Sequence, residues 1–190
     1  MSALPAEPIA YWTIADLESF PDDGKRYEII NGDLFVSKQP HWHHQQSSGL
    51  ILSALNTWCA ESGLGQTSHD PGLIFDDRNA VVPDVVWVSN ERLQDILGED
   101  GKLHDAPDLV VEVLSPGPTN IQRDRDTKRR LYSARGVREY WVVDWQLKSL
   151  QVYRREEGAL TLVGTFYPED ELTSPLLPGF KVSVARLFPG

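Results

Sequence analysis

The feature of this sequence that most limits its fold is a carboxylate inside an apolar run. Five of the six residues at positions 109–114 are apolar, and a break containing Pro116 follows them. This pattern predicts a strand that is buried on both faces. Glu112 lies within that strand, where an unpaired polar group costs about 2–7 kcal/mol and a charge costs more. A cation, a proton or a metal ion must therefore offset the charge of Glu112.

Composition predicts one cytoplasmic globular domain over residues 1–190, with residues 1–12 as a loose N-terminal arm. Hydrophobic residues make up 41% of the chain and charged residues 24%, which is ordinary for a soluble globular protein. No apolar run is long enough to span a bilayer, and the N-terminus has neither a basic start nor an apolar signal core. Cys59 is the only cysteine, which excludes an internal disulfide and a thiolate-cluster zinc site.

The formal net charge of −10 disfavours unspecific attraction to nucleic acid, because the summed field repels phosphate. It leaves room for a local basic patch. Seven of the 18 Lys and Arg residues fall within sixteen positions: Arg123, Arg125, Lys128, Arg129, Arg130, Arg135 and Arg138. The usual interpretation of such a run is a solvated helix face.

Periodicity and turn signals predict a mixture of helices and strands. Helices are predicted at residues 13–19, 44–62, 91–97 and 120–134. Strands are predicted at residues 73–75, 81–88, 109–114, 139–144 and 149–153. A hairpin is predicted at residues 27–36, since Asn31 and Gly32 suit a tight type I′ turn. A last sheet pair is predicted between residues 160–166 and 180–184.

Glu112 needs a partner carboxylate if it is to hold a metal ion. Asp108 shares its face of the strand but lies four residues away, about 13 Å along the strand. One ion holds its oxygen ligands at roughly 2.0–2.6 Å, so Asp108 and Glu112 cannot share it. Asp84 is the best candidate, because it opens an apolar strand that could lie beside the first. The alternative for Asp84 is a solvated strand-end residue next to Pro83.

The helix after Pro118 supplies a third group. Asp124, Lys128, Leu131 and Tyr132 follow the spacing of one helical stripe. Leu131 and Tyr132 should pack on the sheet, which aims Lys128 at the sheet edge. The alternative is a surface pair between Asp124 and Lys128, worth only about 0.3–0.5 kcal/mol.

Two carboxylates from neighbouring strands and a lysine fit metal-assisted hydrolysis. The carboxylates would hold a hard divalent ion that polarises a phosphoryl oxygen and lowers the pKa of bound water. The lysine would orient or deprotonate the attacking water and offset charge in the transition state. Magnesium fits an all-oxygen site without thiolates better than zinc does.

Six motifs in chain order carry a resemblance to a known family. They are Tyr27-Glu-Ile-Ile-Asn-Gly-Asp-Leu34, Pro83-Asp-Val-Val-Trp-Val88, Pro107-Asp-Leu-Val-Val-Glu-Val-Leu-Ser-Pro116, Arg123-Asp-x-x-x-Lys-x-x-x-Tyr132, Gly136-Val-x-Glu-Tyr-Trp-Val-Val-Asp144 and Leu177-Pro-Gly-Phe180. Together they resemble the Uma-two family of restriction-endonuclease-like proteins, in the PD-(D/E)xK nuclease superfamily. The likeness runs from about Thr13 to the C-terminus.

The resemblance implies an α/β fold of mixed α+β type, with a restriction-endonuclease-like αβββαβ core. Its mixed central sheet would be flanked by helices and extra β-hairpins. The metal, Mg²⁺ or Mn²⁺, would lie at Asp84, Glu112 and Val113. The catalytic residues would be Asp84, Glu112, Lys128 and Glu28.

The sequence departs from the superfamily motif at one position. Two residues after Glu112, where the motif has lysine, stands Leu114. The Uma-two family is similar in this respect, and the resemblance moves the lysine role to Lys128. Glu28 resembles an additional acidic residue that some of these nucleases use, although a hairpin position also fits a plain exposed residue.

Four further residues are candidates for substrate contact: His44, Gln45, Arg123 and Asp124. His44 matches the family's position at the start of the long helix, where helix capping or phosphate contact fits better than zinc. The six tryptophans are expected to pack in the core and along strands rather than to stack on bases.

The favoured hypothesis is a divalent-metal-dependent endonuclease that hydrolyses phosphodiester bonds in DNA. Its partners would be nucleic acid and a second copy of the chain, with no membrane contact. The alternative is a non-catalytic module that keeps the fold and binds nucleic acid or protein, favoured by the acidic balance and by Leu114. A third possibility is hydrolysis of a small phosphate ester, which needs no extended basic groove.

Overall fold

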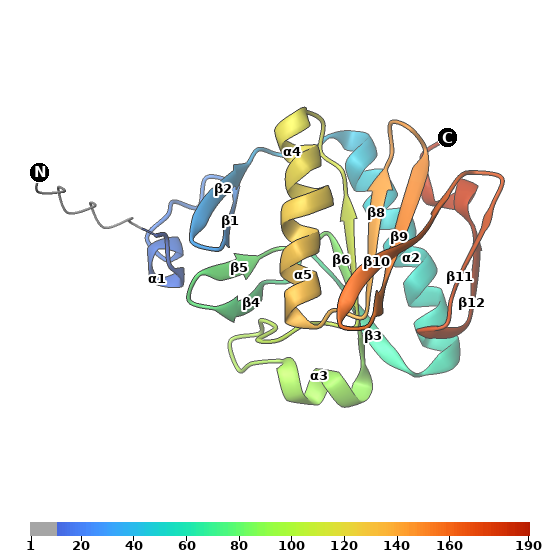
Figure 1. Cartoon of the computed structure of the whole chain (residues 1–190), viewed down its shortest axis with the longest axis horizontal. Coiled ribbons are helices and arrows are strands. Elements are labelled where there is room, and N and C mark those ends of the chain that lie inside the picture. Colours follow the sequence, from blue (N-terminus) through green and yellow to red (C-terminus); the bar gives the residue numbers. More distant parts are fainter. Residues whose placement is uncertain (1–10) are drawn as a thin grey trace, which may run out of the picture.

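The computed structural model describes residues 11–190, which form three β-sheets flanked by helices (Figure 1). The large sheet has six strands in the order β10-β9-β8-β7-β6-β3. Its strands are β3 (Gly65–His69), β6 (Val85–Ser89), β7 (Leu109–Val113), β8 (Glu139–Asp144), β9 (Ser149–Glu156) and β10 (Ala159–Phe166). β7 and β8 run parallel, and the other neighbours are antiparallel. This mixed central sheet confirms the predicted fold class.

Two smaller sheets lie beside the large one without pairing with its edge strands. The four-stranded sheet has the order β2-β1-β5-β4 and consists of β1 (Arg26–Ile30), β2 (Asp33–Ser37), β4 (Leu73–Asp76) and β5 (Asn79–Val81). The two-stranded sheet consists of β11 (Glu171–Ser174) and β12 (Leu177–Ser183). In Figure 1 the four-stranded sheet lies to the left of the large sheet.

Helices connect and cover these sheets. They are α1 (Ile14–Leu17), α2 (Trp42–Ser62), α3 (Asn90–Ile96), α4 (Pro118–Gln122), the π-helical segment η1 (Arg123–Lys128), α5 (Arg129–Arg135) and the 3₁₀ turn η2 (Val184–Leu187). Among the described residues, no helix has both the length and the apolar character that a bilayer crossing requires.

Strand β7 is buried on both faces, as its apolar run predicts. Leu109 and Val111 pack into a core that includes Ile51 of α2. Val110 packs into a second core on the other face, which includes Leu131 of α5. The helices α2 and α5 therefore cover opposite faces of the large sheet, and Glu112 lies on the α5 side.

Local signals place several element ends correctly. Asn31 and Gly32 both have positive φ values, 54° and 83°, between the paired strands β1 and β2, as a type I′ turn requires. Gly63 and Gly136 end their helices in the left-handed conformation, which costs glycine no Cβ clash. The predicted hairpin and both helix ends are confirmed.

The single strand predicted at residues 81–88 is wrong, and the error matters for the site. β5 ends at Val81 in the four-stranded sheet, and β6 starts at Val85 in the large sheet. Pro83 has no amide hydrogen for a ladder and breaks the strand. The chain changes sheets at this break, so that Asp84 stands where the two sheets meet.

The helix predicted at residues 120–134 is not a regular α-helix. Residues Arg123–Lys128 form a π-helical segment between α4 and α5. π-helical turns are rare and occur often at functional sites. Here the segment buries Arg123, Asp124 and Lys128 together, which a regular repeat of 3.6 residues does not favour.

Other departures concern strands and aromatic residues. The edge strand β3 was not predicted. The predicted pairing of residues 160–166 with residues 180–184 is wrong, because β10 pairs with β9 and β12 pairs with β11.

The N-terminal arm and two tryptophans also differ from expectation. Residues 1–10 of the predicted arm lie outside the described residues, but the Trp12 amide donates to the Gly32 carbonyl over 2.9 Å. Trp12 and Trp42 are 42% and 72% exposed, which corrects the expectation that all tryptophans pack inside.

Because β7 lies at the centre of both cores, we expect Leu109→Ala to lower the stability of the fold strongly. Leu109 is fully buried, and such a truncation lowers the free energy of unfolding by about 2–5 kcal/mol. Leu162→Ala is the matched control, since Leu162 lies in the edge strand β10 and is 52% exposed. Its cost should stay below about 1 kcal/mol. Urea denaturation measures both, and similar losses would contradict this assignment of the core.

Candidate active site

The pairing of β6 with β7 brings Asp84 and Glu112 together. Val85 pairs with Val111 in antiparallel register, so Asp84, just before β6, reaches the end of β7 that carries Glu112. One Asp84 oxygen, Oδ2, accepts a 2.7 Å hydrogen bond from the Val113 amide. Asp84 and Glu112 are each only 2% exposed. Asp84 is thus a buried neighbour of Glu112 rather than a solvated strand-end residue.

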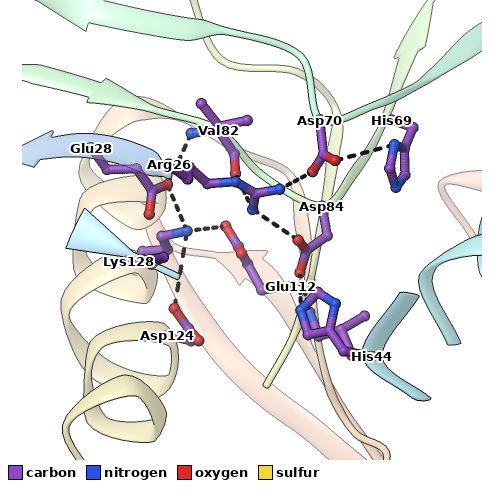
Figure 2. A network of polar contacts seen from close by, with 12 residues as sticks. Arg26, Glu28, His44, His69, Asp70, Val82, Asp84, Glu112, Asp124 and Lys128 are labelled. Carbon is purple, nitrogen blue, oxygen red and sulfur yellow. Dashed lines mark hydrogen bonds and ion pairs between the residues drawn. The ribbon is translucent and has the colours of Figure 1, made fainter. Parts of the chain in front are cut away.

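Lys128 lies at the centre of a group of buried carboxylates (Figure 2). Its Nζ is 2.9 Å from Glu112 Oε1, 2.9 Å from Glu28 Oε1 and 4.0 Å from Asp124 Oδ1. The Tyr132 hydroxyl donates a further 2.7 Å hydrogen bond to Glu112 Oε1. Lys128 is 1% exposed, so the alternative of a surface pair with Asp124 is wrong.

Glu28 reaches this group from the four-stranded sheet. It is 1% exposed and accepts a 2.9 Å hydrogen bond from the Val82 amide. β1 pairs with β5, and this pairing carries Glu28 to the side of Lys128. The alternative of a plain exposed hairpin residue is therefore wrong.

Two cations face these three carboxylates, because Lys128 contacts Glu28 and Glu112 while Arg123 pairs with Asp124. Burial, opposed by Lys128 and reinforced by Asp84, Asp124 and Glu28, raises the pKa of Glu112 to about 8. Burial works to lower the pKa of Lys128, but the surrounding carboxylates outweigh it and raise that pKa. These shifts favour the charged form of Lys128 and oppose the ionisation of Glu112.

Asp84 is charged because a second set of cations surrounds it. Burial works to raise its pKa, but the hydrogen bond from His44 and the charges of His44, Arg26 and Lys128 lower it below its usual range. His44 Nε2 is 3.3 Å from Oδ2, and Arg26 Nη1 is 3.0 Å from Oδ1. Arg26 also pairs with Asp70 (Figure 2).

Sequence reasoning missed Arg26, Asp70 and the polar role of Tyr132. Arg26 and Glu28 are two residues apart in β1, and the period of a strand places both on one face. That signal could have added Arg26 once Glu28 was suspected. Asp70 follows β3, which was not predicted, so no pattern pointed to it.

The remaining candidate residues line the same pocket, whose volume is about 490 Å³. The lining includes His44, Gln45, Val113, Arg123 and Asp124, together with Asp84, Glu112 and Lys128. Arg123 Nε donates to Asp124 Oδ1 over 2.8 Å, and its Nη1 donates to the Ser37 hydroxyl over 2.9 Å. All the candidate residues except Glu28, which lies behind Lys128, thus contribute to one recess.

The run of basic residues is mostly paired, so its prediction as a solvated helix face is wrong. Arg125 pairs with Asp144 at 3.1 Å, Arg138 with Asp108 at 3.1 Å, and Arg135 with Asp76. Two others, Arg123 and Lys128, are buried. These cations hold carboxylates of the chain itself and do not form one free basic surface.

The donor set of the pocket fits a hard divalent ion of low ligand count. No group of three or more His, Cys, Asp or Glu side chains within residues 11–190 is arranged to hold a metal. Mg²⁺, however, binds through one or two carboxylates and keeps several waters. Asp84 and Glu112 are such a pair, and Glu112 Oε2 receives no hydrogen bond from the described residues. Burial is the main cause of the raised pKa of Glu112, and the neighbouring carboxylates Asp84, Asp124 and Glu28 add to it.

Removing the Lys128 ammonium should destabilise the fold strongly. In Lys128→Met the volume is kept, but Glu28 and Glu112 remain buried without their shared cation, so we expect a loss of about 3–5 kcal/mol in unfolding free energy. Lys181→Met is the matched control, because the 2.8 Å Lys181–Glu171 pair is 65% and 48% exposed. It should cost less than about 1 kcal/mol. Equal losses in urea denaturation at neutral pH would refute the central role of Lys128.

Comparison with known proteins identifies a similar fold and the family of the chain. A crystal structure from Anabaena variabilis ATCC 29413, described as "a putative nuclease belonging to DUF820", superposes with a TM-score of 0.74 at 20% identity, covering 95% of this chain and 98% of that chain. The type IIG restriction endonuclease BpuSI matches 74% of this chain and 15% of its own at 16% identity, with a TM-score of 0.37. No curated protein matches the chain. Residues 14–185 match the Uma2 family, described as "Putative restriction endonuclease", and the chain belongs to that family.

Proposed function

We propose that this protein is a divalent-metal-dependent endonuclease that hydrolyses phosphodiester bonds in DNA, acting in the cytoplasm as a homodimer. The observation that carries the proposal is the convergence of buried Asp84, Glu112 and Lys128 on one pocket. Membership of the Uma2 family and the nuclease-like fold support it. Glu112 Oε2, which receives no hydrogen bond from residues 11–190, adds a place for a cation.

The metal, Mg²⁺ or Mn²⁺, would be held by the side chains of Asp84 and Glu112 and by the backbone carbonyl that Val113 can offer. When bound, such an ion supplies Lewis-acid polarisation of a phosphoryl oxygen and a lower pKa for bound water. Arg26 and His44 keep Asp84 ionised. Asp84 is therefore ready as an anionic ligand at neutral pH.

Lys128 would stabilise charge and orient water rather than remove a proton. Its pKa is raised by the carboxylates around it, so a free amine is scarce at neutral pH. Glu28 holds the ammonium from behind, at 2.9 Å. A fixed cation facing the pocket would offset the negative charge that develops on a phosphoryl group in the transition state. Arg123, also in the lining, is suited to bind a phosphate oxygen.

Cleavage of circular DNA tests the catalytic proposal. Circular DNA, double-stranded or single-stranded, has no free ends, so only an endonuclease can cut it. With Mg²⁺ or Mn²⁺, we expect Asp84→Asn, Glu112→Gln and Lys128→Met each to lower the rate by at least about 10²–10³-fold, as loss of an electrostatic stabiliser does. Because Lys128→Met should also destabilise the fold, the rate of each variant is expressed per folded molecule, as measured by urea denaturation.

Asp108→Asn is the matched control for the cleavage assay. Asp108 is a buried carboxylate that precedes the same strand at its other end, where it pairs with Arg138 and accepts from the Ser89 amide. It does not line the pocket. Its variant should cleave at the wild-type rate. Equal rates in all the variants, or no cleavage by the wild type, would refute the proposal.

The non-catalytic binding module remains the second candidate, because Arg26 and Lys128 already occupy oxygens of both carboxylates. Calorimetric titration with Mn²⁺ separates the two candidates. We expect the wild type and Asp108→Asn to bind the ion and Glu112→Gln to lose that binding. Absence of binding, or binding that Glu112→Gln leaves unchanged, would favour the module.

A further inference from the structure

An aromatic cluster stands at the start of α2. The His41 and Trp145 rings are nearly parallel, at 14°, with their centroids 4.6 Å apart. The His43 ring lies 5.5 Å from Trp145 and 5.3 Å from His41. His41 is exposed, and His43 and Trp145 are half-buried. We call His41, His43 and Trp145 the aromatic platform.

The aromatic platform lies next to the pocket through two chain segments, the start of α2 and the turn after β8. His41 caps α2 three residues before His44, whose Nε2 lies 3.3 Å from Asp84. The Trp145 indole N–H donates to the Leu114 carbonyl over 3.1 Å, one residue beyond Val113 of the pocket lining. The α2 start and the β8–β9 turn meet at one end of the large sheet, at the top of Figure 1.

Another part of the pocket rim is basic. Lys25, Arg26, Lys38 and Arg123 contribute to the lining, and Lys25 and Lys38 are exposed. Carboxylates of the chain pair with Lys25, Arg26 and Arg123, so the exposed Lys38 is the cation of this rim with no ion pair among the described residues. Cations suit the phosphates of a nucleic-acid backbone, while aromatic rings suit the faces of bases. A DNA strand crossing the pocket would contact the cations through its phosphates. It would contact the aromatic rings only if its bases were unpaired or were turned out of a duplex.

Depth and charge also disfavour a regular duplex. Asp84 and Glu112 are each 2% exposed, so a scissile phosphate must enter the recess to reach them. Duplex DNA is stiff over about 150 base pairs, whereas a single strand bends into a recess more easily. Duplex DNA carries one negative charge per about 1.7 Å, and a single DNA strand carries one per about 3.4 Å. The net charge of −10 therefore repels a duplex more strongly than a single strand.

We infer that the aromatic platform stacks unpaired nucleobases, which makes single-stranded or locally unpaired DNA the preferred substrate of the proposed nuclease. This inference rests on the proposed function and names its substrate class. One site is sufficient to cut one strand. The platform acts by binding and takes no part in the chemistry of the phosphate.

Binding of labelled oligonucleotides in EDTA tests the inference without cleavage. The probes are a single strand, its duplex and a strand of the same length with abasic sites. The wild type should bind the single strand at least about tenfold more tightly than either other probe, because stacking contributes strongly per base. His41→Ser removes one ring but keeps a good helix cap and should remove most of that preference.

Tyr167→Ser is the matched control, because it removes a ring that is 47% exposed outside the pocket lining. It should bind all the probes as the wild type does. Equal binding of the single strand by His41→Ser, or of the abasic strand by the wild type, would overturn the inference. Tighter binding of RNA than of DNA of the same sequence would also overturn it.

The cleavage assay keeps the two proposals distinguishable. Metal-dependent cutting of both circular forms at one rate would overturn the substrate preference and leave the nuclease intact. His41-dependent binding of single strands without any cutting would overturn the nuclease and support the platform as a base-binding site.

Discussion

The ammonium of Lys128 is the point on which the rest of the site depends. It lies between Glu28 of the four-stranded sheet and Glu112 of the large sheet, at 2.9 Å from each, and it comes from a third element, η1. A buried ion pair adds little net stability, because desolvation offsets much of the attraction, yet losing one partner is costly. The contact therefore constrains how two sheets and a helix fit together more than it strengthens any of them. The ammonium also offsets the burial of the Glu28 and Glu112 carboxylates, which would be costly to bury without a cation.

The π-helical segment explains how one short stretch delivers three buried charged groups. In an α-helix successive residues turn by about 100°, so residues five apart lie about 140° from one another. The wider turn of a π-helix brings such residues closer to one side. Arg123, Asp124 and Lys128 are all buried in η1, and Asp124 lies between the two cations, 2.8 Å from Arg123 and 4.0 Å from Lys128. A local departure from regular geometry thus serves the charge balance of the pocket.

Patterns that depend on near neighbours in the sequence predicted much of this fold. The apolar run of β7, the Asn31–Gly32 turn and the stripe of Leu131 and Tyr132 each carry their own signal, and Asp84 followed from the second apolar strand. The rest depends on contacts that are distant in the chain. Pro83 was expected near the start of one strand or on a sheet edge, but it lies between two strands that belong to different sheets. β3 is polar, Gln66-Thr67-Ser68-His69, and becomes a strand by pairing with β6. Glu28 is buried because Lys128, 100 positions later, reaches it.

The cations around the pocket are unevenly distributed between its two carboxylates. The pKa of Asp84 is lowered, whereas the pKa of Glu112 is raised. Asp84 has Arg26 and His44 within 3.3 Å, which holds its pKa low. Burial, reinforced by Asp84, Asp124 and Glu28 and opposed by Lys128, raises the pKa of Glu112 to about 8. A cation held by both carboxylates, as proposed above, would require the ionised form of Glu112, since a ligating carboxylate must be ionised. On the Glu112 side, Oε2 receives no hydrogen bond from the described residues. The proposed divalent cation would therefore add positive charge beside the carboxylate whose burial Lys128 only partly offsets.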